Sequence, residues 1–185
     1  MSTNDPTIDP GWPRGSALVW MLLPFTGFGM RRLAVNDGLI SLRQMFLKFA
    51  SLGVWVGVVI LLFVEPGGEL TSGWVAAQVV VGIASVIGVV VLRGARRLDC
   101  TNPRALAGSY RSRVLTSMPA AMAPVTFGFL FSVVSQCRWL YLIGMAFAAV
   151  AFVVAAPSVG DLRRTQARLD ADGCSLSLVA AVRTP

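Results

Sequence analysis

The chain has 185 residues, of which 55% are hydrophobic and only 14% are charged. Soluble domains carry about 25% charged residues, so this chain has too little charge to cover its surface in water. The mean hydropathy of +0.70 agrees with this reading. Together these values exclude a disordered chain, a disulfide scaffold and a typical soluble enzyme, and they predict an integral membrane protein.

The net charge of +7 comes almost entirely from arginine, since Lys48 is the one lysine. Nucleic-acid-binding proteins gather their basic residues among exposed polar neighbours. Here nearly all the arginines lie within a turn or two of long apolar runs. This pattern favours membrane-flanking residues over a nucleic-acid patch, so we expect no nucleic-acid partner. The bias toward arginine is typical of a G+C-rich genome and favours a bacterial source.

The N-terminal region, residues 1–38, is expected to be a polar tail followed by an interfacial segment. Residues 1–15 are rich in Asp, Pro and Gly. Residues 17–28 are apolar but interrupted by Pro24 and Gly27, and they are too few for a span, which needs about 20 residues. We expect them to lie in the membrane interface or to be re-entrant, with an extra crossing as the alternative.

Four later stretches are apolar and long enough to cross a bilayer. They predict an all-α integral membrane fold, with residues 39–157 forming a transmembrane bundle of two helical hairpins. The third stretch contains Pro119 and Pro124 and is expected to be kinked. The four spans are expected at about residues 42–64, 70–92, 114–134 and 139–156.

The cations are distributed unevenly among the connections between the spans. Fifteen of the sixteen lie in the N-terminal flank, the connection between the second and third spans, or the C-terminal tail. Only Arg138 belongs to the other side, where Glu65 and Glu69 also lie. The positive-inside rule then places both termini in the cytoplasm of a bacterial inner membrane.

Residues 158–185 are expected to form a cytoplasmic tail that begins with a short amphipathic helix. Ser158 suits the position that caps the start of this helix, and Gly173 suits its end. Leu162 and Leu169 recur at a seven-residue interval on one side. We expect these two leucines to dock on a partner or to dip into the membrane interface.

Small residues recur along the spans and are the main candidates for helix packing. Small side chains let helix backbones approach closely in lipid, and a buried glutamine can hydrogen-bond between helices. No residue pattern in the spans indicates a pore. The candidate packing and interaction residues are Gly53, Gly57, Gln78, Gly82, Gly88, Gly144, Ala148, Leu162 and Leu169.

The sequence offers no constellation for catalysis. It has no histidine, and the four spans hold no acidic residue at depth, where an ionisable group would mark a transport or coupling site. Cys100, Cys137 and Cys174 are far apart in the sequence, and the expected topology puts Cys137 opposite the other two. We therefore expect no catalytic, cofactor or metal site, and no enzyme activity.

Two hairpins joined by a basic loop resemble the doubled proteolipid of rotary ATPases, which carries its ion on a carboxylate within a span. Residues 70–92 and 139–156 contain no Asp or Glu, so only the outline of that family is matched. The small multidrug transporters need a glutamate in their first helix, which residues 53–62 lack.

The chain is also similar, over its whole length, to small four-span actinobacterial membrane proteins that accompany envelope transporters, in particular accessory subunits of Mce-type lipid importers. The resemblance lies in the polar N-terminus, the four spans and the Arg-rich tail. It implies a non-catalytic accessory subunit packed against permease-type subunits of a larger inner-membrane complex, in contact with membrane lipid. The alternative is a small homo-oligomeric transporter or channel that uses Gln78 and the kinked third span as its polar path.

Overall fold

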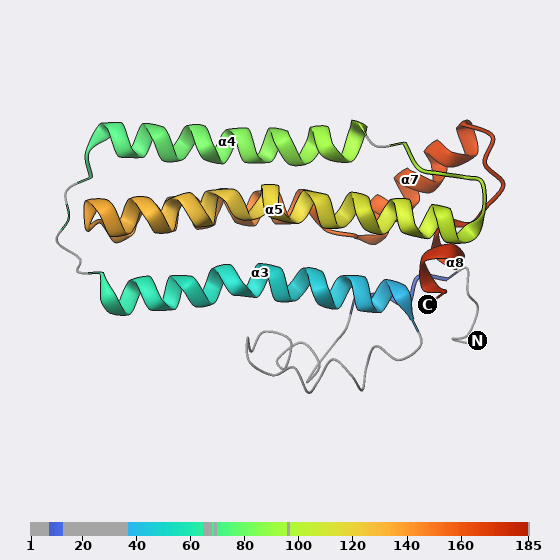
Figure 1. The fold of residues 1–185 in the computed structure, drawn as a ribbon, viewed down its shortest axis with the longest axis horizontal. Helices are drawn as coiled ribbons and strands as arrows, with labels where there is room; N and C mark the ends of the chain where they lie inside the picture. The colour runs from blue at the N-terminus through green and yellow to red at the C-terminus, as the bar shows by residue number, and fades with distance from the viewer. Residues whose placement is uncertain (1–7, 13–36, 65–67, 69, 96, 185) are drawn as a thin grey trace. The chain divides into compact units, whose positions relative to one another are not determined.

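The computed structural model describes residues 8–12, 37–64, 68, 70–95 and 97–184, and the elements in these residues are helices. Four of the helices are long and apolar enough to cross a membrane, which confirms the expected all-α membrane fold. The expected interfacial segment, residues 17–28, lies outside the described residues. The helices, shown in Figure 1, are α3 (Gly38–Phe63), α4 (Ser72–Ala95), α5 (Pro103–Ser135), α6 (Arg138–Ala155), α7 (Val159–Ala171) and α8 (Leu178–Arg183).

Helix α5 begins eleven residues before the expected third span, because the apolar run marks the membrane-spanning part and not the helix start. The side-chain oxygen of Asn102 accepts a hydrogen bond from the Ala105 N–H at 2.9 Å, which caps the helix. Pro103 then occupies the first helical position, where its missing N–H has no cost. The early turns of α5 bury Leu106 and Tyr110.

The chain divides into two compact units. We call the first the terminal unit; its described residues are 8–12, 37–48, 97–115 and 156–184. We call the second the span unit; it contains the described part of residues 49–95 and residues 116–155.

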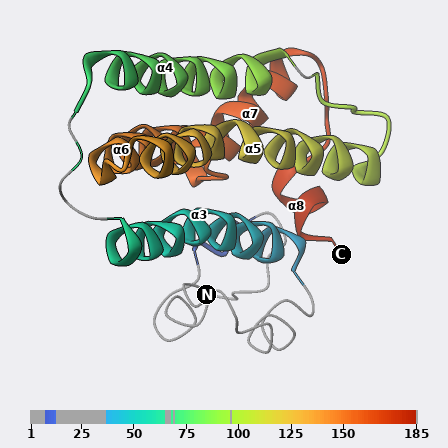
Figure 2. The same ribbon diagram turned by 60° about the vertical axis from the view of Figure 1, so that its left-hand side comes forward.

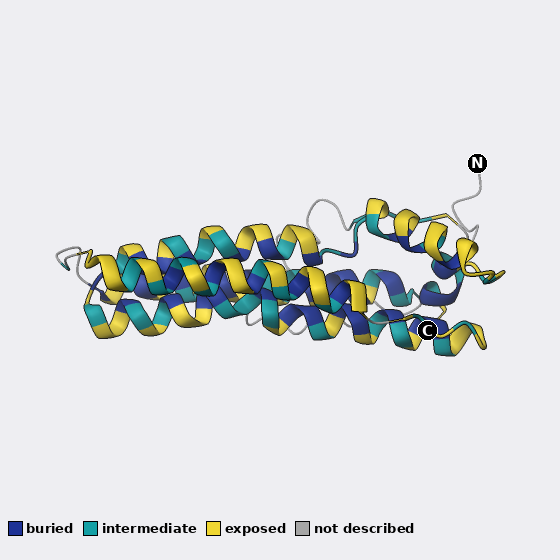
Figure 3. Ribbon diagram, turned by 90° about the horizontal axis from the view of Figure 1, so that it is seen from above, coloured by how far each residue is buried: buried dark blue, intermediate teal, exposed yellow. Residues whose placement is uncertain are grey.

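The span unit is built from consecutive helical segments that run in alternating directions, as Figure 2 shows, and α4 packs beside α6. Its core contains Ile60, Val64, Val125, Tyr141 and Ala148. Many exposed positions on these helices, coloured yellow on the ribbon in Figure 3, carry apolar residues such as Val80, Ile83 and Val153. This is the arrangement that lipid or a membrane partner requires, since neither demands a polar surface.

The terminal unit contains the expected tail helix, α7. The Ser158 hydroxyl accepts a hydrogen bond from the Asp161 N–H at 3.2 Å, and Gly173 follows the helix with a φ of +81°. Leu162 and Leu169 do not project outward as expected, because they are only 2% and 5% exposed. They are buried in the terminal unit, so neither leucine is available to a partner or to the membrane interface.

Candidate functional site

Gln78 forms the main polar contact between spans. Its side chain is fully buried, and its Nε2 donates a hydrogen bond to the Pro124 carbonyl at 2.8 Å. A Cβ on Gly144 would lie 2.3 Å from that same carbonyl oxygen and 2.5 Å from Gln78 Nε2. Helices α4, α5 and α6 therefore meet at this point, and the contact requires a glycine on α6.

Ser85 makes a second contact between α4 and α5. Proline has no N–H, so Pro124 leaves the carbonyl of Ala120, four residues earlier, without its usual helical donor. The Ser85 hydroxyl donates to that carbonyl at 2.6 Å. Sequence reasoning missed this role, although Ser85 follows Gln78 by seven residues and so lies on the same face of α4.

Tyr141 of α6 contacts Gly53 and Gly57 of α3, two glycines with three residues between them. Its hydroxyl donates to the Gly53 carbonyl, and a Cβ on Gly57 would lie 2.9 Å from the tyrosine ring. Gly57 thus makes room for an aromatic side chain, whereas a Cβ on Gly53 would lie 3.5 Å from Val125 and 3.7 Å from the Met145 sulfur. The signal in the sequence was the tyrosine itself, because a buried hydroxyl needs a partner.

The remaining packing candidates fall in different environments. A Cβ on Gly82 would lie 2.3 Å from the Phe147 ring, so the glycine makes room for that ring. Ala148 is buried, at 2% exposed. Gly88 has no atom within 4 Å of the position a Cβ would take, so its side of α4 is open.

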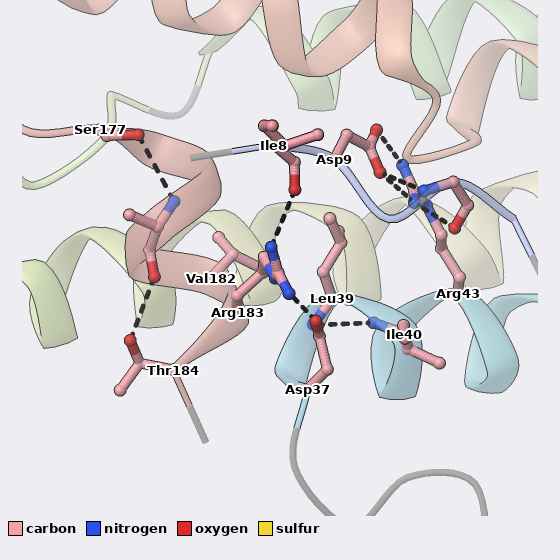
Figure 4. Close-up of polar contacts among 12 residues, drawn as sticks. Ile8, Asp9, Asp37, Leu39, Ile40, Arg43, Ser177, Val182, Arg183 and Thr184 are labelled. Atoms are coloured by element: carbon pink, nitrogen blue, oxygen red, sulfur yellow. Dashed lines mark hydrogen bonds and ion pairs between the residues drawn. The ribbon is translucent and has the colours of Figure 1, made fainter. Parts of the chain in front are cut away.

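In the terminal unit, Arg43 is enclosed by the N-terminal segment, as Figure 4 shows. Its guanidinium makes two hydrogen bonds to the Asp9 carboxylate, at 2.6 and 2.7 Å, and also donates to the carbonyls of Gly11 and Pro157. The Trp12 ring lies 5.2 Å from the guanidinium carbon. Arg43 lies in the early turns of α3, and the segment around Asp9 supplies the polar partners that a buried cation needs.

The pKa of Asp9 is lowered by this contact. Burial raises the pKa, but hydrogen bonds from Arg43 and the Gly11 N–H, and attraction to Arg43 and Arg183, outweigh burial. The pair therefore stabilises the folded chain above the ordinary pKa of aspartate. That stabilisation is lost as the pH falls through the lowered pKa of the folded state.

Two further links, an ion pair and a disulfide, attach the C-terminal tail of the chain to the rest of the terminal unit. Arg183 forms an ion pair with Asp37 at 2.7 Å and donates to the Ile8 carbonyl at 2.9 Å (Figure 4). Cys100 and Cys174 are joined by a disulfide. Their separation of 74 residues gave no reason to expect this pairing; they meet because the tail folds back to the connection between α4 and α5.

The contacts described above join helices and chain segments within each unit. The described residues contain no group of three or more His, Cys, Asp or Glu side chains that could hold a metal ion. Comparisons with family models, curated proteins and solved structures find no match to this chain. The fold therefore defines the class only: a multi-pass membrane protein with four apolar helices.

Replacing Gln78 by leucine should weaken the span unit only slightly. The change removes the hydrogen bond to the Pro124 carbonyl, and such bonds between membrane helices contribute about 0.6 kcal/mol on average. The loss of Gln78 Oε1, for which the described part of the chain provides no hydrogen-bond partner, offsets part of that cost. Thermal unfolding of the purified protein in detergent measures the effect, and a fall in Tm of more than about 5 °C would contradict a role as a single helix contact.

Proposed function

We propose that this protein is a non-catalytic accessory subunit that stabilises a larger membrane complex. The observation that carries the proposal is the contrast between the inside and the outside of the span unit. Inside, Gln78, Ser85 and Tyr141 bond to backbone carbonyls of neighbouring helices. Outside, α4 presents an apolar face that is not covered by the described residues.

The exposed face of α4 has the spacing of a helix-packing seam. We call Val80, Ile83, Ile87 and Val90 the α4 seam; they are 65%, 49%, 57% and 54% exposed. Their alternating intervals of three and four residues repeat every seven residues, the pattern of knobs-into-holes packing. All four are β-branched, so they are stiff and lose little side-chain freedom when they pack against a helix.

The partner in this proposal is a permease-type subunit, and the complex is one that moves lipid, such as an Mce-type importer. The four-span outline and the basic tail support this choice, as does the low burial of α4, with 22% of its apolar window buried. In the proposed orientation both termini face the cytoplasm of a bacterial inner membrane. The subunit itself holds no substrate.

Isolation after crosslinking in cells tests the proposal. A tagged chain extracted in mild detergent should be recovered with a much larger membrane protein. Ile87→Trp, which places a bulky ring in the α4 seam, should reduce that recovery about tenfold, since overpacking costs about 1–3 kcal/mol. Val153→Trp on α6, where Val153 is 78% exposed, is the matched control and should leave recovery unchanged. A monomer without any co-purifying protein contradicts the proposal.

The second candidate is a small homo-oligomeric transporter or channel. The observation that favours it is the buried Gln78 Oε1, which has no hydrogen-bond partner among the residues that the structure describes. A flux assay in liposomes containing only the purified chain separates the two functions. We expect no substrate movement; movement that Gln78→Leu abolishes would favour the transporter.

A further inference from the structure

The disulfide between Cys100 and Cys174 joins two loops of the terminal unit. Cys100 belongs to the connection between α4 and α5, and Cys174 to the connection between α7 and α8. Both residues are half-buried, and their neighbours Asp99, Thr101 and Gly173 are exposed. A small thiol or disulfide can therefore approach either sulfur from solvent.

The charge pattern predicts the side of the membrane on which this disulfide lies. The connection between α4 and α5 and the C-terminal tail are the Arg-rich segments that the positive-inside rule places in the cytoplasm. Disulfides in the cytosol are usually transient, and they serve redox sensing or catalysis. A permanent structural bond does not fit that side of the membrane, whereas a reversible bond does.

We propose that Cys100 and Cys174 form a reversible thiol–disulfide pair that fastens the C-terminal tail in response to the cytoplasmic redox state. The oxidant is a low-molecular-weight disulfide. One cysteine thiolate attacks a sulfur of this disulfide, forms a mixed disulfide and releases one small thiolate. The other cysteine thiolate attacks the protein-bound sulfur, closes the Cys100–Cys174 bond and releases the second small thiolate. The protein dithiol is oxidised, the small disulfide is reduced, and the two leaving thiolates take up the two protons that the cysteines lose.

Other contacts keep the tail folded when the bond is open. The Tyr110 hydroxyl donates to the Asp161 carboxylate at 2.9 Å, and Arg111 donates to the carbonyls of Val182 and Thr184 at 3.1 and 2.9 Å. Because these contacts do not involve the cysteines, reduction should free the connection between α7 and α8 without unfolding α7. The bond thus controls how firmly the tail is held, and it does so whether or not a partner subunit is present.

Thiol trapping in cells tests the reversibility of the bond. Cells are quenched in acid, and the denatured protein is treated with a maleimide polymer that shifts its gel mobility once for each free thiol. Cys137 is a free cysteine and provides one constant label. We expect three labels in untreated cells, one label after brief exposure to the thiol oxidant diamide, and three again after the oxidant is removed. Cys100→Ser should show two labels in untreated cells and should lose at most one after the oxidant, to a mixed disulfide at Cys174, because it cannot close the bond that removes two labels together.

Two patterns of labelling would overturn the proposal. One label in untreated cells would show a permanent disulfide, and three labels after the oxidant would show that the pair does not form. Limited proteolysis of the purified full chain by trypsin tests the effect on the tail. Trypsin should cut at the arginines of the tail, residues 156–184, several-fold faster in the reduced than in the oxidised protein. Cys100→Ser should be cut at the rate of the reduced wild type under both reducing and oxidising conditions. Equal rates in the wild type would show that the bond does not fasten the tail.

Discussion

Replacing Gly144 by leucine should lower the stability of the span unit by about 3 kcal/mol, the upper part of the range for overpacking a core. The new side chain would begin 2.3 Å from the Pro124 carbonyl oxygen, which belongs to the α5 backbone and cannot rotate away. Helices α5 and α6 must separate to accept it, and the hydrogen bond from Gln78 to the same carbonyl is then lost. The Tm of the purified protein in detergent should fall by about 10 °C.

Gly88→Leu is the matched control for this experiment. It makes the same chemical change on α4, where a Cβ would meet no atom within 4 Å. The Tm of the purified control should stay at or slightly above that of the wild type, because leucine has a higher helix propensity than glycine. Equal losses in the two variants would show that the α5–α6 contact at Pro124 does not decide the stability.

Replacing Arg43 by methionine should destabilise the terminal unit by about 3 kcal/mol, the order of magnitude for breaking a buried ion pair. The change leaves the Asp9 carboxylate, which is 13% exposed, without its partner, and removes the donor to the Gly11 and Pro157 carbonyls. Thermal unfolding in detergent measures the loss. Arg168→Met, at an exposed position on α7, is the matched control and should change the Tm little.

The double variant Arg43→Met, Asp9→Asn separates the ion pair from simple loss of packing. It should be more stable than Arg43→Met alone, because no unpaired carboxylate remains. The pH dependence gives an independent measure. The stability difference between the wild type and Asp9→Asn should be greatest above the ordinary pKa of aspartate and should shrink as the pH falls through the lowered pKa of Asp9. A difference that does not change with pH would show that the Asp9 charge is not held by Arg43.

Sequence reasoning located the apolar helices because continuous apolar runs are a local signal. It also found the tail helix from Ser158 and Gly173, which act within a few residues of their own positions. Sequence reasoning did not predict the start of α5. The turns after Asn102 are polar, so they resemble a loop until their buried side is known.

The contacts between distant segments were much harder to predict from the sequence. Gln78 was recognised as a helix contact from its burial in an apolar run, but its acceptor on α5 was not. Arg43 and Asp9 are 34 residues apart, and no local pattern pairs them. The periodicity of Leu162 and Leu169 showed that they share a face, but it could not show that this face is covered by the chain itself. Each of these outcomes depends on tertiary packing, which a single sequence does not display.

The most direct test of the proposed accessory role is photo-crosslinking in cells from the α4 seam. A photoreactive amino acid at position 83 or 87, both exposed on α4, should give one discrete adduct with a larger membrane protein. The same amino acid at position 153, which is exposed on α6, should not give that adduct. Adducts with lipid alone or with a second copy of the chain, or the same larger adduct from α4 and α6, would contradict the proposal that the α4 seam packs against a partner subunit.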